Sequence, residues 1–461
     1  MSKNAAGAGQ RQAVPGSIRQ VRGATYPPLT APPARAAQSA AAAVASAAAP
    51  TLARLTSLAR AVTLRDSTVA PGAADTASAP APPSAPRRAA ASAASAKVDV
   101  SDQAPKQAIS GSGAASLTPM SLEVQRLRKF EALLVAEVVD LKALRAAAWS
   151  GVPHQCRSST WQLLLGYLPP NRTWRESTLE RKRREYAEAV PQYFDVSDAE
   201  RSENHRAMLH QILIDVPRTQ PGAKIFRMSV VQRALERILY IWALRHPASG
   251  YVQGINDLVT PFYFVFLSER LPKDRPVTED DLESLSPEEL LAAEADAYWC
   301  LSKLIDAIQD HYTDAQPGIQ RMVYKLQNLV KRIDVPLHTH LEEQGLQFIQ
   351  FAFRWMNCFL MRELSLDLIL RVWDTYLAEY GAASGPSADP TASSDGFAVL
   401  HVYACAALLS KYSADLRTME FQDLVMFLQK LPTTGWSEKD VGELLSLAYV
   451  YQSLYSQAHV S

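Results

Sequence analysis

The chain has 461 residues, and its 47 Lys plus Arg balance 47 Asp plus Glu, so the formal net charge is zero. This balance argues against a generally basic nucleic-acid-binding protein and against a chain with a long acidic tail. At roughly 150 residues per domain the length suggests about three domains, but the composition changes along the chain.

Residues 1–120 differ from the rest of the chain in both charge and composition. They hold 12 basic and four acidic residues, for a net charge of +8, so the remaining residues carry −8. About a third of the segment is Ala, and Pro, Ser and Gly make up much of the rest, so it can bury little apolar surface. We interpret residues 1–120 as a disordered, low-complexity basic tail.

This basic tail raises three functional questions. No acidic residue precedes Asp66, as in organelle transit peptides, but the first residues lack a strong amphipathic start, and we favour a plain Ala-rich tail. Leu52, Leu55, Leu58 and Val62 recur at helical spacing beside Arg, so weak peripheral contact with an anionic membrane stays open. No aromatic residues alternate with the Arg, so we expect no specific nucleic-acid partner.

The four cysteines, Cys156, Cys300, Cys358 and Cys405, lie far apart and form no Cys-x-x-Cys pair. This spacing argues against a local tetrahedral metal site, and we expect four buried, reduced thiols. The longest nearly continuous apolar run, residues 258–267, is about half of the ~20 residues needed to cross a bilayer. The sequence therefore predicts no transmembrane helix.

From Ser121 onward the apolar residues recur with a period near 3.6, which predicts helices, and Ser121 is the expected N-cap of the first one. A lead-in helix is expected within 121–145. Further helices are expected over 158–167, 178–190, 200–213, 229–245, 251–268, 288–311, 317–331, 338–361, 365–379, 397–411, 419–429 and 437–457. Few stretches alternate with a period of two, and Gly and Pro mark the joints, so the predicted fold class is all-α.

Two stretches interrupt the helical pattern. Residues 274–296 are acidic, and residues 381–396 are rich in Gly, Ala, Ser, Pro and Asp. We interpret both as surface insertions. Within the first, Ser286-Pro-Glu-Glu289 has the composition of a helix start.

Three short patterns in the helical part carry polar residues of functional interest. The first is Arg157 and Trp161, which lie four residues apart in a helix that follows a Gly-Val-Pro turn. Residues at i and i+4 share one helix face, so the guanidinium can stack on the indole. We interpret this pair as an anchor of the core.

The second pattern is Ile212-x-x-Asp215-x-x-Arg218, with Pro217 directly before the arginine. Because Pro217 disfavours helix at the preceding residue, we expect the helix to end near Leu213 and an extended turn to carry Arg218 outward. Asp215 would hold the base of the arginine through a charge-assisted hydrogen bond. Taken alone, the pattern favours a surface or Asp-paired arginine over a functional one.

The third pattern is Tyr251-Val-Gln253, followed by Asn256. Pro247 and Gly250 predict a helix start that places Gln253 in the first helical turn, where a solvated cap is the plain interpretation. A neutral amide there can also orient a water molecule without titrating. An arginine and a glutamine on neighbouring loop ends are what a phosphoryl-transfer site needs besides nucleotide and Mg²⁺, since one neutralises developing charge and the other aligns the water.

In this order, the three patterns resemble the motifs R-x-x-x-W, I-x-x-D-x-x-R and Y-x-Q of the TBC domain of Rab GTPase-activating proteins. The resemblance extends to the longer stretches Ala148–Pro153, Ile241–Pro261, Phe353–Asn357 and Arg371–Thr375, and it covers about residues 140–455. It is greatest to the branch typified by TBC1 domain family member 22 and its yeast Golgi counterpart.

This resemblance implies a V-shaped, two-lobed, all-helical TBC domain over residues 146–457. The N-terminal catalytic lobe would span about 146–315 and the C-terminal lobe about 316–457. Arg218 then corresponds to the arginine finger of the family and Gln253 to its glutamine finger. The supporting residues would be Asp215, Tyr251, Arg157, Trp161 and Asn256.

The resemblance also implies the partner, a GTP-bound Rab. That GTPase would hold GTP and Mg²⁺, so no cofactor or metal is expected on this chain, which would supply catalytic residues in trans and would not be an enzyme by itself. A cytoplasmic location, peripheral to Golgi or endosomal membranes, follows in the same way. Because both finger residues are present, we favour an activator over the alternative, a non-catalytic Rab-binding scaffold or effector.

A metal hydrolase is a third hypothesis, built on His338, His340, Glu342 and Glu343. Two histidines at i and i+2 point to different sides of a helix and are poor joint ligands. We therefore expect capping or surface roles for these histidines.

Overall fold

A computed structural model gives the fold, and it describes residues 119–272, 275, 277–381 and 396–456. These described residues belong to one compact unit. The basic tail up to residue 118 and nearly all of the expected 381–396 loop lie outside the described residues.

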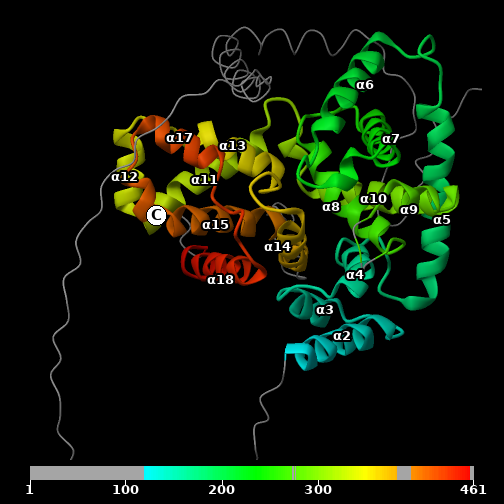
Figure 1. Cartoon of the computed structure of the whole chain (residues 1–461), viewed down its shortest axis with the longest axis horizontal. Helices are drawn as coiled ribbons and strands as arrows, with labels where there is room; N and C mark the ends of the chain where they lie inside the picture. The colour runs from blue at the N-terminus through cyan, green and yellow to red at the C-terminus, as the bar shows by residue number, and fades with distance from the viewer. Residues whose placement is uncertain (1–118, 273–274, 276, 382–395, 457–461) are drawn as a thin grey trace, which may run out of the picture. The chain divides into compact units, whose positions relative to one another are not determined.

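Two groups of helices follow one another along the chain (Figure 1). The first group comprises α2 (Pro119–Val135), α3 (Leu141–Ala148), α4 (Arg157–Leu164), α5 (Arg175–Ala189), α6 (Glu203–Asp215), α7 (Ser229–Arg245), α8 (Ile255–Ser268), α9 (Glu279–Glu283) and α10 (Pro287–Ala307). The second comprises α11 (Pro317–Ile333), α12 (Val335–Glu343), α13 (Phe348–Cys358), α14 (Leu366–Glu379), α15 (Gly396–Lys411), α16 (Ser413–Leu416), α17 (Phe421–Gln429) and α18 (Glu438–Tyr455). The part of the chain that the structure describes contains no β-strand, so the all-α prediction is confirmed.

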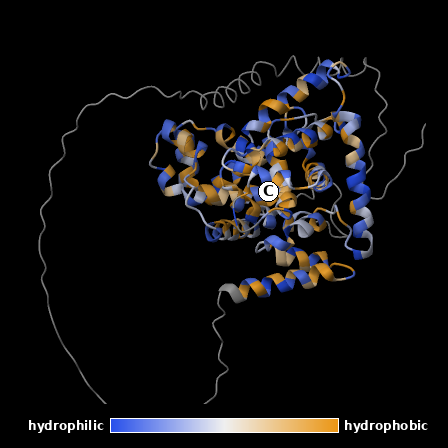
Figure 2. Cartoon of the chain, turned by 45° about the vertical axis from the view of Figure 1, so that its right-hand side comes forward, coloured by the Kyte–Doolittle hydropathy of each residue, from blue (hydrophilic) through white to orange (hydrophobic). Residues whose placement is uncertain are grey.

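Each group of helices packs around a central helix, and α14 joins the two groups. In the first group α10 packs against α5, α7 and α8, and in the second α11 packs against α13 and α15. α14 contacts α3, α4 and α8 as well as α15 and α18. Trp161, Phe262 and Trp373 meet at this junction with ring centroids 5.3 to 6.2 Å apart. The buried residues are mostly apolar, and most helices carry both hydrophobic and hydrophilic residues (Figure 2). The expected limits of the two lobes stay a prediction.

Several local expectations are confirmed. α7 spans the expected residues 229–245. At the start of α10, the Ser286 side chain accepts a hydrogen bond from the Glu289 N–H at 3.2 Å, and the Glu289 carboxylate accepts one from the Ser286 N–H at 2.9 Å. This reciprocal capping satisfies two N–H groups that the first turn leaves unpaired. All four cysteines are buried and free, as expected. As a separate finding, none of the described helices is long and apolar enough to cross a membrane.

Two expectations about helix limits are wrong. α2 begins at Pro119, so Ser121 lies inside that helix and is not its N-cap. The single helix expected over 338–361 is two helices, α12 and α13. Gly345 lies between them with a φ of +72°, a left-handed conformation that ends the first helix and that glycine adopts without steric cost.

The acidic stretch 274–296 is only partly a surface insertion, because its second half belongs to α10 and carries buried carboxylates. Glu294 is fully buried and accepts hydrogen bonds from Arg237 Nη2 and from the Tyr186 hydroxyl, both at 2.6 Å. Burial raises the pKa of Glu294, and the bonds to these donors oppose that shift by stabilising the carboxylate. The acidic composition therefore predicted a surface position wrongly here. The arginine that pairs with Glu294 is Arg237, which lies on a different helix.

Candidate functional site

The Arg157–Trp161 pair is held by a third residue, Asp374 of α14. Arg157 donates from Nε to Oδ1 and from Nη2 to Oδ2 of Asp374, both at 3.1 Å, and Trp161 donates from Nε1 to Oδ1 at 2.8 Å. The backbone N–H of Val152 donates to Oδ2 at 2.8 Å. The expected stack of guanidinium on indole is therefore not what holds this pair: both groups converge on one buried carboxylate.

Arg218 lies on a short turn directly after α6. That helix continues to Asp215, and Val216–Arg218 form one turn of 3₁₀ helix. The extended turn expected here is wrong, because the buried Val216 keeps helical dihedral angles, with φ −57° and ψ −46°. Pro217 fits this first turn, where no N–H is required. Arg218 is exposed, and its side chain has no hydrogen-bond or ion-pair partner among the described residues.

Asp215 is buried and does not hold Arg218, contrary to expectation. Its Oδ2 accepts hydrogen bonds from the Tyr251 hydroxyl at 3.0 Å and from Gln211 Nε2 at 3.1 Å. Burial is the largest cause that raises the pKa of Tyr251, and the negative charge of Asp215 adds to it. The hydroxyl therefore stays protonated and remains a donor. Asp215 therefore links the second sequence pattern to the third.

Gln253 lies before α8, not in its first turn. α8 begins at Ile255, and the N-cap is Gly254 with a φ of +116°, which L residues rarely adopt. The helix start expected at residues 247–250 is therefore wrong, since the chain turns there and enters the helix later. The Gln253 side chain is exposed and makes no hydrogen bond within the part of the chain that the structure describes.

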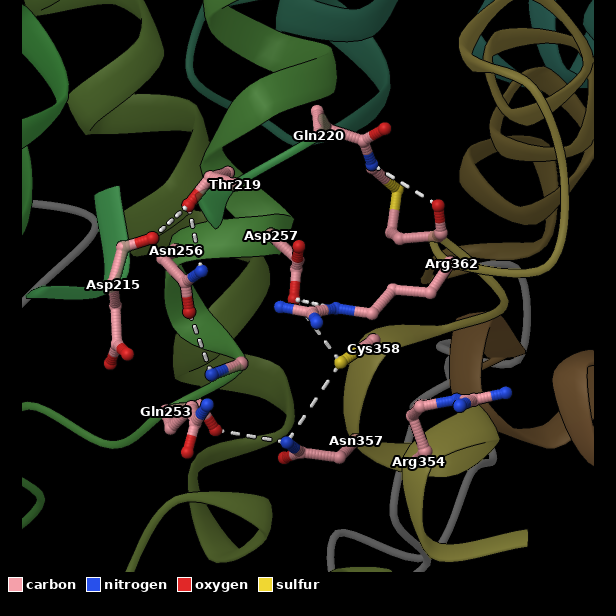
Figure 3. A network of polar contacts seen from close by, with 12 residues as sticks. Asp215, Thr219, Gln220, Gln253, Asn256, Asp257, Arg354, Asn357, Cys358 and Arg362 are labelled. Carbon is pink, nitrogen blue, oxygen red and sulfur yellow. Dashed lines mark hydrogen bonds and ion pairs between the residues drawn. The ribbon is translucent and has the colours of Figure 1, made fainter. Parts of the chain in front are cut away.

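Asn256 ties the loop of Gln253 to the turn of Arg218. Its Oδ1 accepts a hydrogen bond from the Gly254 N–H, and its Nδ2 donates to Thr219 Oγ1, both at 2.9 Å. Thr219 follows Arg218 directly, and its hydroxyl donates to the carbonyl of the residue at the end of α6 at 2.9 Å. Buried, hydrogen-bonded residues thus fix the backbone beneath both exposed side chains, and Figure 3 shows Asn256 between Thr219 and the loop of Gln253.

A third segment, at the end of α13, completes the network, and sequence reasoning did not assign it to the site. Asn357 Nδ2 donates to the Gln253 carbonyl at 2.9 Å, and Gln220 Nε2 donates to the Met361 carbonyl at 3.1 Å (Figure 3). The segment from Asn357 at the end of α13 to Met361 beyond it therefore contacts the loops of both exposed residues. A single sequence does not show that a segment more than 100 residues away along the chain contacts these loops.

Asp257 is the buried carboxylate of this network, and its charge is compensated. Its Oδ2 accepts hydrogen bonds from Arg362 Nε at 3.0 Å and from the Cys358 thiol at 3.3 Å. The charge of Asp257 raises the pKa of Arg362, and burial raises the pKa of Cys358, so the thiol stays protonated. Because an arginine pairs with this carboxylate, it adds little negative potential beside Gln253.

The site thus brings together five of the seven residues expected from the sequence, which are Arg218, Gln253, Asp215, Tyr251 and Asn256. Arg157 and Trp161 belong to the separate cluster around Asp374. Of the residues in the metal hypothesis, His338 Nδ1 lies 3.3 Å from a Glu342 carboxylate oxygen, but His340 Nε2 lies 2.9 Å from the carbonyl of Met419. In the residues with a described structure, no group of three potential ligands could hold a metal ion.

Comparison with known proteins places this geometry in context. The sequence matches the Rab-GTPase-TBC domain over residues 154–416. It is 51% identical over 335 residues to GTPase-activating protein gyp1 of Schizosaccharomyces pombe, which covers 73% of this chain and 62% of that protein. It is 47% identical over 352 residues to human TBC1 domain family member 22B, which covers 76% and 66% respectively. The chain therefore spans less than two thirds of the length of these curated relatives.

The fold also matches a solved structure. The crystal structure of the Ypt/Rab-GAP domain of Gyp1p has a TM-score of 0.66 and 43% sequence identity to this chain. The match covers 72% of this chain and 99% of that one. The helical architecture described above is therefore that of the solved domain.

Proposed function

Because the chain belongs to the Rab-GTPase-TBC domain family, we propose that it accelerates GTP hydrolysis by a Rab-family GTPase. In this proposal the Rab holds GTP and Mg²⁺, and this chain supplies Arg218 and Gln253 in trans. The relative with the name GTPase-activating protein gyp1 supports the activity, and the match to the Ypt/Rab-GAP domain of Gyp1p supports the class of partner.

The observation that carries the proposal is the contrast between two exposed side chains and the buried residues next to them. Arg218 and Gln253 are exposed and have no partner among the described residues, whereas Thr219 and Asn256, which follow them, are buried and bonded to each other. Many exposed side chains lack a partner within the fold, but at these two positions buried hydrogen bonds also link and fix the backbone that carries the side chains. The side chains of Arg218 and Gln253 are therefore available to bind a group on another molecule.

The chemistry of the two groups suits phosphoryl transfer. The guanidinium of Arg218 presents a planar set of N–H donors to charge that develops on the γ-phosphate and the bridging oxygen. In GTPases of this kind such an arginine is worth ~10³ to 10⁵ in rate, or ~4 to 7 kcal/mol of barrier. The Gln253 amide is neutral, so it can accept from and donate to the attacking water at any physiological pH.

The cellular setting is part of the same proposal. We place the protein in the cytoplasm and peripheral to Golgi or endosomal membranes, by analogy with its family branch. Residues 1–120 would add weak electrostatic attraction to an anionic surface, because they carry a net charge of +8.

A single-turnover GTP hydrolysis assay with a panel of GTP-loaded Rabs tests the function. The full-length protein should shorten the lifetime of GTP on at least one Rab. Arg218→Ala and Gln253→Ala should each remove most of the stimulation and leave the thermal unfolding temperature within about 2 °C, since both side chains are exposed and unpartnered.

Arg184→Ala is the matched control, because Arg184 is an exposed arginine of α5, outside the network of Figure 3. It should keep full stimulation. A protein that binds GTP-loaded Rab but leaves the hydrolysis rate unchanged on every Rab would overturn the proposal and establish the scaffold instead.

A further inference from the structure

The peptide unit between Gln253 and Gly254 is held from both sides by asparagine side chains. Its carbonyl accepts a hydrogen bond from Asn357 Nδ2, and its N–H donates to Asn256 Oδ1, each at 2.9 Å. Asn256 belongs to α8 in the first group of helices, whereas Asn357 belongs to α13 in the second. A peptide unit with both polar groups bonded cannot rotate without breaking one of the bonds, so the direction in which Gln253 leaves the backbone is fixed.

The sequence at Gly254 fits this arrangement. A Cβ at position 254 would lie 2.3 Å from Asn357 Nδ2 and 2.9 Å from its Cγ. The φ of +116° places the chain in a region that L residues rarely adopt. The absence of a side chain at Gly254 therefore lets the Asn357 amide approach the backbone closely enough to bond it.

Asn357 is itself held rigidly. The Tyr312 hydroxyl donates to the Asn357 carbonyl at 2.8 Å, and Tyr312 is fully buried. Beyond Cys358 the chain leaves α13 through Phe359 and Leu360, with φ of +48° and +61°. Two consecutive non-glycine residues in this left-handed region persist only where packing imposes the conformation, and both side chains are fully buried.

We propose that Asn357 is a positioning residue for Gln253: its amide fixes the 253–254 peptide so that the exposed glutamine side chain meets the attacking water at a set place. This inference rests on the proposed function, because only a hydrolysis site gives Gln253 a water to orient. It assigns a part of the active geometry to the second group of helices, which supplies neither exposed finger. Displacement of a catalytic group by ~1 Å can cost ~100-fold in rate, so one backbone bond at this point matters.

A double-mutant cycle on the GTP-loaded Rab that responds to the wild type separates positioning from general stability. Asn357→Ala should lower kcat for stimulated hydrolysis by ~10- to 100-fold and change KM by less than ~3-fold. In a Gln253→Ala background the same substitution should lower kcat by less than ~2-fold, because the group that it positions is already gone. If Asn357→Ala folds poorly, Asn357→Ser replaces it in the cycle. Its hydroxyl is too short to reach the Gln253 carbonyl, so the same changes in kcat and KM are expected.

A second measurement needs no Rab, so it tests the inference even if the proposed function fails. Amide hydrogen exchange in the peptide that contains Gly254 should become faster in Asn357→Ala, because the bonded peptide unit is released. Thr433→Val is the control: it removes another buried hydrogen bond, from the Thr433 hydroxyl to the Glu363 carbonyl, which does not reach Gln253. This variant should leave both the exchange at Gly254 and kcat unchanged.

Two results would overturn the positioning role. One is an equal loss of kcat from Asn357→Ala with and without Gln253, which would show a structural effect on the whole site. The other is unchanged exchange at Gly254 in a folded Asn357→Ala protein. If the wild type stimulates no Rab while the exchange at Gly254 still responds to Asn357→Ala, the proposed function is wrong and the backbone role of Asn357 stands.

Discussion

Removal of the Asp374 carboxylate should strongly destabilise the fold, because three donors depend on it. Asp374 has no exposed surface, and it accepts from the Arg157 guanidinium, the Trp161 indole and the Val152 N–H. In Asp374→Ala these donors stay buried or nearly so, since the Arg157 side chain is only 15% exposed. Water cannot replace the carboxylate at the indole or at the backbone N–H without opening the contact between α4 and α14.

The expected loss is large relative to the total stability. Breaking a buried ion pair by removing one partner costs ~3 to 5 kcal/mol, and a domain is typically stable by ~5 to 15 kcal/mol. For a domain of a few hundred residues each kcal/mol lowers the unfolding temperature by ~2 to 4 °C. We therefore expect Asp374→Ala to unfold about 10 °C below the wild type.

Thermal unfolding followed by far-ultraviolet circular dichroism measures this loss. Asp367→Ala is a matched control, because Asp367 lies on the same helix but is exposed. It should move the unfolding temperature by no more than about 2 °C. A shift of under about 2 °C for Asp374→Ala as well would refute the view that this carboxylate anchors the two groups of helices.

Three further predictions follow from buried groups. Gly254→Ala should lower both the unfolding temperature and any stimulated GTPase rate, because its Cβ would collide with the Asn357 amide; unchanged values would contradict the packing. Trp161→Ala should cost ~3 to 5 kcal/mol in a denaturant titration by leaving a cavity. Burial lowers the pKa of His401 to about 3, so the unfolded chain binds a proton near pH 6.5 that the folded chain excludes. Stability should therefore fall as pH drops from 6.5 toward 3, by up to ~1.4 kcal/mol per pH unit from this group, and His401→Gln should flatten the slope measured by pH-dependent unfolding.

The sequence predicted best those features that depend on neighbouring residues. The periodic stretch 229–245 gave the limits of α7, and Ser286 with Glu289 gave the start of α10. The sequence predicted the start of a helix less well where the conformation of one glycine determines the direction of the backbone. Gly254, with its positive φ, moves Gln253 out of the helix in which the pattern placed it.

Contacts between distant segments were beyond a single sequence. Asp374 lies 217 residues from Arg157, and Asn357 lies 104 residues from the carbonyl that it binds. Asp215 was expected to pair with Arg218 three residues away, but it pairs with Tyr251, 36 residues away. For Arg157 and Asp215 the spacing suggested only a nearby partner, and for Asn357 it suggested none, whereas the packing of the helices brings the distant partner into contact.

The most direct test of the central claim compares wild type with Arg218→Lys in single-turnover GTP hydrolysis on the Rab that responds best. Lysine keeps the positive charge but lacks the planar set of donors, so the account predicts loss of at least ~10³ in stimulated rate with unchanged unfolding temperature. Full stimulation by Arg218→Lys would contradict it, because the exposed arginine would then not be the group that stabilises the transition state.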